Sequence, residues 1–131
     1  MQRNPDFEQS SANAEQLHAS REERARDRVM SRANGQIAEQ PWRPAPVPPT
    51  AVDLVNFSVW RSMDAESDEL ADALALLPAA RAEVEGLEAG MLFAARSAGL
   101  TWAQIASAMG FRSPQACQQH YARLLDRHEA Q

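Results

Sequence analysis

The side chains most capable of covalent or metal chemistry lie near the carboxyl end of the sequence. Cys117 and His120 are three residues apart, and His128 follows. A zinc site needs about four ligands in a tetrahedral array, but the sequence has no second cysteine and its acidic residues concentrate elsewhere. A Cys–His nucleophile pair needs a third group that orients the base, and the pattern suggests none. We therefore expect a small buried thiol at Cys117, with no metal site and no cofactor.

Phosphate-binding and nucleophile motifs are also missing from the sequence. It contains no G-x-x-x-x-G-K-[ST] loop and no G-x-S-x-G elbow. We therefore expect a protein that is not an enzyme.

Amide and guanidinium side chains in the same region offer a different chemistry. Gln115, Gln118 and Gln119 are spaced so that a helix would place them on one face. Glutamine bonds adenine bidentately, and arginine bonds guanine or phosphate. Such a face suits a helix that lies in a DNA groove and contacts base edges. The plainer interpretation, a solvated helix surface, stays open at this point.

The charge of the sequence bears on this hypothesis in two ways. The 131 residues carry a formal net charge of −5, and all 13 basic residues are arginines, which argues against coating nucleic acid through bulk charge. Between residues 89 and 125, however, there is no acidic residue, whereas Arg96, Arg112 and Arg123 are basic. The local charge therefore favours contact with phosphate although the overall charge does not.

Local signals divide residues 99–125 into two short helices and a tight turn. Thr101 and Gln104 fit a T-x-x-Q capping box, and Gly110 stands where a positive φ costs little. Ser113 and Pro114 then fit the cap and first position of a second helix over residues 114–127. The residues expected to face the core are Trp102, Ile105, Ala106, Met109, Phe111, Ala116, Cys117, Leu124 and either His120 or Tyr121.

Residues 1–49 are expected to form a disordered, flexible arm and a Pro-rich linker. They contain few large apolar residues, so folding would bury too little surface to offset its entropy cost. Within the arm, residues 14–33 are good helix formers and indicate a solvated, frayed helix. Five prolines in residues 41–49 favour extended polyproline II.

Residues 50–77 are expected to form a helical segment. Thr50 and Asp53 resemble a capping box, although the alternation of Val55, Phe57 and Val59 also fits a strand. The positions predicted to share apolar helix faces are Val52, Val55, Val59 and Met63, then Leu70, Leu74 and Leu77. Because Phe57, Trp60 and Leu74 exceed the apolar content that an appendage needs, we expect a homodimer surface here.

An amphipathic helix is predicted over residues 79–98, with Gly99 well placed to end it. Its apolar residues at helical spacing are Ala80, Val84, Leu87, Met91, Ala94 and Ala98, with Leu92 and Ala95 beside them. This helix precedes the two short helices, so residues 78–131 are expected to form one helix-turn-helix domain.

The residues of this domain resemble the second and third helices of Myb/SANT-type repeats. The shared pattern is a Trp, an Ile-Ala pair, a G-R-[ST]-P-x-x-C run, and a closing aromatic and leucine. The matching residues are Trp102, Ile105–Ala106, Gly110, Arg112–Ser113–Pro114, Cys117, Tyr121 and Leu124. Residues 98–106 are also similar to small helix-turn-helix regulators and nucleoid-associated proteins of high-GC bacteria. Two departures are Phe111, inserted before the arginine, and glutamines where Myb repeats have basic residues.

The resemblance implies an all-α helical bundle ending in a helix-turn-helix, with double-stranded DNA as the partner. It places base-reading positions at Gln115, Gln118 and Gln119. Phosphate contacts are expected from Thr101, Arg112, Ser113 and Arg123, with a local cap or ion pair as the alternative for Arg112. The implied function is a transcriptional regulator or nucleoid-associated protein, and the alternative is a SANT-type protein–protein interaction module.

The expected location is the bacterial cytoplasm, at the nucleoid. A single cysteine fits a reducing compartment. No segment reaches the roughly 18 to 20 apolar residues that span a membrane, so no membrane association is expected.

Overall fold

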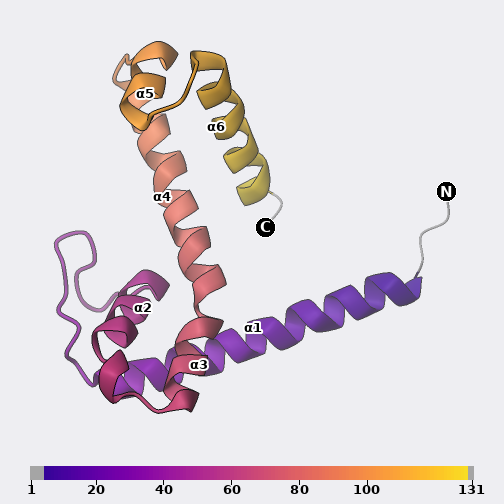
Figure 1. Ribbon diagram of the computed structural model, residues 1–131, viewed down its shortest axis with the longest axis vertical. Helices are drawn as coiled ribbons and strands as arrows, with labels where there is room; N and C mark the ends of the chain where they lie inside the picture. Colours follow the sequence, from indigo (N-terminus) through magenta and orange to yellow (C-terminus); the bar gives the residue numbers. More distant parts are fainter. Residues whose placement is uncertain (1–4, 130–131) are drawn as a thin grey trace. The chain divides into compact units, whose positions relative to one another are not determined.

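The computed structural model describes the backbone of residues 5–129 and the side chains of residues 5–127. Over this range the chain is helical and contains no strand, only an isolated bridge between Gln40 and Arg43. The helices are α1 (Pro5–Ala33), α2 (Ala51–Trp60), the short 3₁₀ helix η1 (Ser62–Asp64), α3 (Ser67–Ala75), α4 (Leu77–Ser97), α5 (Trp102–Met109) and α6 (Pro114–Glu129) (Figure 1). The predicted all-α class is confirmed, and the strand alternative for residues 50–63 is wrong.

The chain divides into two compact units, an amino-terminal unit of residues 1–80 and a carboxy-terminal unit of residues 81–131. The sequence predicted a three-part division at residues 49 and 77. In the structure α1 packs on α2 and α3 and so joins the predicted arm to the segment 50–77.

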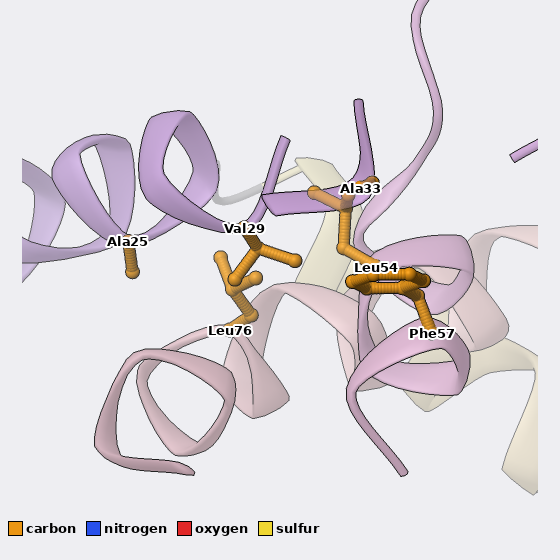
Figure 2. Close-up of a cluster of buried hydrophobic side chains, with 6 residues drawn as sticks. All are labelled: Ala25, Val29, Ala33, Leu54, Phe57 and Leu76. Carbon is orange, nitrogen blue, oxygen red and sulfur yellow. The ribbon is translucent and has the colours of Figure 1, made fainter. Parts of the chain in front are cut away.

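The core of the amino-terminal unit lies where the end of α1 meets α2 and α3. Figure 2 shows Val29 of α1 beside Leu76, which follows α3, and Ala33 beside Leu54 and Phe57 of α2. Residues 5–19 of α1 are exposed throughout, but Ala25, Val29 and Ala33 are buried. The expectation of a solvated helix over residues 14–33 is thus wrong for its last turns.

A buried carboxylate fastens α1 to α3 beside this core. Asp72 is almost fully buried, and its two carboxylate oxygens lie 3.0 Å from Arg28 Nη1 and 2.8 Å from Arg32 Nη1. The two arginines offset the cost of removing this charge from water. The charged residues of α1 suggested a solvated helix, but two of its arginines instead hold α1 against α3.

The predicted linker is anchored at Arg43. This side chain is buried; its Nη2 donates to the carbonyl oxygen of Ala38 at 2.6 Å and its Nε lies 2.9 Å from Asp53 Oδ2. Asp53 also completes the predicted capping box with Thr50, whose Oγ1 accepts from the Asp53 amide. One carboxylate thus fixes both the start of α2 and the chain that leads to it.

The apolar faces predicted for α2 and α3 are only partly buried, with Val55 packed against the core. Ala51, Leu54 and Phe57 are buried in α2, whereas Val59 and Met63 are exposed. On α3, Leu70 and Leu74 are exposed and Asp72 faces inward. Phe57 belongs to the internal core, so it is not available to the predicted homodimer surface; Trp60 and Leu74 are exposed.

The carboxy-terminal unit comprises α4 from Arg81, α5 and α6, and α5 and α6 lie beside the second half of α4 (Figure 1). Its buried residues are Leu92, Ile105, Ala106, Cys117 and Leu124, with Ala95, Trp102, Phe111 and Tyr121 packed against them. The helix-turn-helix is thus confirmed. Of the expected core residues, Met109 is 40% exposed because it lies at the end of α5.

Candidate nucleic-acid interface

Local capping builds the turn between α5 and α6 as the sequence predicts. Thr101 Oγ1 accepts from the Gln104 amide at 3.1 Å, and Gln104 Oε1 accepts from the Thr101 amide at 2.8 Å. Gly110 ends α5 with φ of 81°, a left-handed conformation that favours glycine. Ser113 Oγ then accepts from the Ala116 amide at 3.1 Å, and α6 begins at Pro114. These interactions fix the direction in which α6 leaves the turn.

One side of α6 is buried and the opposite side is open. Cys117 and Leu124 are fully buried, so their side of the helix packs on α4 and α5. The glutamines of the opposite side, Gln115, Gln118 and Gln119, are all exposed. Their spacing of three and four residues makes them neighbours on one helical face. The structure therefore brings the three predicted base-reading residues together.

The predicted phosphate-contacting residues are of two kinds. Arg112 and Arg123 are exposed, and neither forms an ion pair with another residue of the described range. Thr101 and Ser113 use their hydroxyl oxygens as helix caps, but each hydroxyl hydrogen can still donate to an anion. Arg112 and Ser113 precede α6, whereas Arg123 lies on its third turn, so the basic groups flank the glutamines.

Arg96 is a residue of this surface that was not among the individually predicted phosphate contacts. Its guanidinium lies 5.1 Å from the centroid of the Trp102 ring, and its Nη1 donates to the carbonyl oxygen of Leu100 at 2.9 Å. Trp102 packs in turn on Tyr121 of α6, with ring centroids 5.8 Å apart. Arg96 is therefore exposed and held near the middle of α6. The signal in the sequence was its place within the stretch free of acidic residues.

Asp126 is the acidic residue nearest to the glutamines along α6. It stands seven residues after Gln119, two helical turns further along the same face, and it is exposed. A carboxylate there repels phosphate. The favourable part of the α6 face therefore ends before Asp126.

A second feature that the sequence did not reveal links α4 to α6. His120 Nε2 lies 2.7 Å from Glu88 Oε1, and the His120 ring packs on Phe111 with centroids 5.2 Å apart. Arg127 Nη1 lies 3.5 Å from Glu85 Oε1, one turn away on α4 and two turns away on α6. These contacts hold α6 at a fixed angle to α4, so they position the glutamine face without belonging to it.

Glu88 supplies the third polar group that a Cys–His pair would need, yet the arrangement does not suit nucleophilic chemistry. Cys117 is fully buried. Burial raises the pKa of its thiol, and the Glu88 carboxylate raises it further. A nucleophilic cysteine requires the opposite, a lowered pKa and access to substrate. The geometry is that of a packed thiol beside a structural histidine–carboxylate contact.

Among the described residues, no three His, Cys, Asp or Glu side chains are grouped so as to hold a metal ion. Nor does the described part of the chain include a helix with the length and apolarity that crossing a bilayer requires.

Comparison with known proteins agrees with this geometry. No curated protein and no solved structure matched the chain. A family model does match the chain, over the last part of α4, α5 and α6. This is the segment that carries the exposed glutamines. The resemblance expected from the sequence is confirmed: residues 89–130 match the Myb-like DNA-binding domain family.

Proposed function

We propose that the carboxy-terminal unit binds double-stranded DNA by inserting residues 114–127 of α6 into the major groove. The observation that carries the proposal is the exposed face of α6, with Gln115, Gln118 and Gln119 adjacent to one another and basic groups on both sides. The major groove admits an α-helix and presents a distinct donor and acceptor pattern for each base pair. The match of residues 89–130 to a DNA-binding family supports the same conclusion.

In this arrangement the glutamines contact base edges and the flanking groups contact the sugar–phosphate backbone. Each glutamine amide offers a donor and an acceptor, which suits the adjacent N6 and N7 positions of adenine. Arg112, Ser113 and the amino-terminal end of α6 contact one phosphate strand. Arg123 contacts phosphate further along α6, and Thr101 and Arg96 do so from the α4–α5 side.

The small number of basic groups sets the kind of DNA binding we propose. Neutralisation of phosphate supplies most of non-specific affinity, and Myb repeats have basic residues where this chain has Gln118 and Gln119. A weakly charged, amide-rich face favours sequence-directed binding over general coating. We therefore propose a transcriptional regulator, or a nucleoid-associated protein with sequence preference, in the bacterial cytoplasm.

The experiment that tests this function is selection of duplexes from a randomised library by the full-length chain. Affinity for a selected and a scrambled duplex is then measured by fluorescence anisotropy. We expect the triple variant Q115A/Q118A/Q119A to lose most of the preference, because each good contact contributes about 1–3 kcal/mol of discrimination. The matched control is Gln16→Ala, an exposed glutamine on α1. An unchanged preference in the triple variant would overturn the assignment of base-reading residues.

A protein–protein interaction module is the second candidate, favoured by the net charge of −5. An open apolar groove in the carboxy-terminal unit also favours it. The groove is lined by residues of α4, of α5 and of the loop between them, including Met91, Ala95, Leu100 and Met109. The same library decides between the candidates. If no duplex is retained even at low salt, where electrostatic attraction is strongest, the interaction module is the correct function.

A further inference from the structure

Helix α4 carries a line of exposed apolar side chains that the carboxy-terminal unit does not use. Val84, Leu87 and Met91 are 53%, 64% and 69% exposed. They are separated by three and four residues, and two exposed alanines continue the line, Ala94 on α4 and Ala98 directly after its end. We call these five residues the α4 stripe. The unit's own core takes Leu92 instead, and the partly buried Ala95 packs against it.

The spacing of the stripe is that of a coiled-coil seam. Residues 84, 87, 91, 94 and 98 alternate steps of three and four, which is the a/d pattern of a heptad repeat. Such a seam fits another helix with the same pattern, and a second copy of the chain necessarily has one. The family match begins at residue 89, so the two first residues of the stripe lie outside the part that resembles a DNA-binding domain.

We propose that the α4 stripe pairs with the α4 stripe of a second copy of this chain, with the two helices antiparallel. The pairing is two-fold symmetric, so each contact occurs twice. Its central layers join Val84 of one copy to Leu87 of the other, and Met91 lies outside these layers, against the first turns of the other copy's α4. The proposal does not depend on DNA binding.

The charges beside the stripe select the antiparallel direction. Arg81 and Glu88 occupy equivalent flanking positions on one side of the seam, seven residues apart, and Glu83 flanks the other side. In an antiparallel pair like sides face each other, so Arg81 of each copy lies near Glu88 of the other, whose carboxylate also contacts His120 of its own chain. In a parallel pair, one side of the seam faces the opposite side of the other helix. Glu83 would then lie near Glu88 of the second copy. Flanking charges of this kind determine helix orientation in coiled coils.

The test is the oligomeric state of the full-length chain by sedimentation velocity over a concentration series. Because each copy carries the substitution, Leu87→Glu places two carboxylates in the seam of the dimer. We expect it to raise the dimer dissociation constant by about 100-fold or more. The matched control is Leu74→Glu on α3, because Leu74 is also 64% exposed and lies on the segment that the sequence suggested for dimerisation. We expect this control to dimerise like the wild type.

Other outcomes overturn the proposal. A monomeric wild type at all concentrations would do so, as would loss of the dimer in Leu74→Glu but not in Leu87→Glu. A second variant, Arg81→Glu, leaves every apolar contact in place and puts a carboxylate near Glu88 of the second copy. We expect it to weaken the dimer about tenfold. Equal affinity in this variant would overturn the antiparallel arrangement.

Crosslinking measures the direction independently. Val84→Cys and Leu87→Cys chains are oxidised separately and as a mixture. An antiparallel pair gives most disulfide-linked dimer in the mixture, because residues 84 and 87 are then opposite. A parallel pair links like residues and gives its dimer in the separate samples. The native Cys117 does not interfere, because it is fully buried.

Discussion

The salt dependence of DNA affinity gives the sharpest test of how α6 meets DNA. Three exposed guanidiniums, those of Arg96, Arg112 and Arg123, surround the glutamine face without an ion pair to any described carboxylate. If each neutralises one phosphate, the logarithm of the affinity falls with the logarithm of salt concentration at a slope of about −2.7. Raising the salt from about 50 to about 200 mM then weakens binding about 40-fold.

Arg123→Gln removes one of these phosphate contacts, so the slope should fall to about −1.8 and the same salt step should weaken binding only about 12-fold. The measurement is fluorescence anisotropy with a selected duplex in a potassium chloride series. If the chain binds as a dimer, the slopes and their difference both double.

Arg127→Gln is the control because it lies on the same helix but pairs with Glu85. An arginine that stays paired with Glu85 neutralises no phosphate and so displaces no counterion from the DNA. This variant should therefore keep the slope of the wild type. The reasoning is refuted if both variants change the slope equally, or if Arg123→Gln leaves it unchanged.

Three further predictions concern single residues. Asp72→Asn should lower the free energy of unfolding by about 1.5–3 kcal/mol, since two arginines of α1 lose their buried partner; urea denaturation followed by circular dichroism measures this, and a loss no larger than that of the exposed Asp64→Asn would contradict it. Gly110→Ala should cost about 1 kcal/mol because its φ of 81° is left-handed, and Gly110→Asn should cost less in the same assay; the reverse order would count against it. Asp126→Asn should tighten DNA binding about twofold, because it removes an exposed carboxylate near phosphate; an unchanged anisotropy curve would show that this end of α6 stays away from DNA.

Capping and turn geometry could be predicted from the sequence because their physical causes lie within three or four residues. Thr50 and Thr101 cap α2 and α5 as expected, Ser113 caps α6, and Gly110 takes the left-handed conformation. The exposed face of α6 could be predicted from the sequence for a related reason. Once the helix is established, its buried Cys117 fixes which side is left to the glutamines.

The buried faces of α2 and α3 could not be predicted, because they depend on a partner helix that looks solvated in the sequence. The buried apolar side chains of α1 are those of Ala25, Val29 and Ala33, with Met30 packed against them, within a highly charged stretch. Asp72 faces inward only because arginines of α1 neutralise it. The periodicity of a single helix does not reveal the partner helix or its arginines. It therefore predicted that Leu70 and Leu74 of α3 face the core, whereas they are exposed.

The link between Glu88 and His120 was also beyond sequence reasoning. The two residues are 32 positions apart, and neither belongs to a recognisable motif. Their contact depends on the angle at which α6 crosses α4, which the core of the unit determines. The outward face of α6 was therefore predictable, whereas the polar contacts that orient it were not.

Chemical labelling of the single thiol can report local opening of the carboxy-terminal unit. Cys117 is fully buried and is the chain's one cysteine, so a thiol reagent reaches it only in molecules whose α6 has detached. The ratio of its labelling rate to that of a free cysteine gives the equilibrium between closed and open forms. Motions of this helix can thus be timed in the unmodified protein, with no dye or tag attached beforehand.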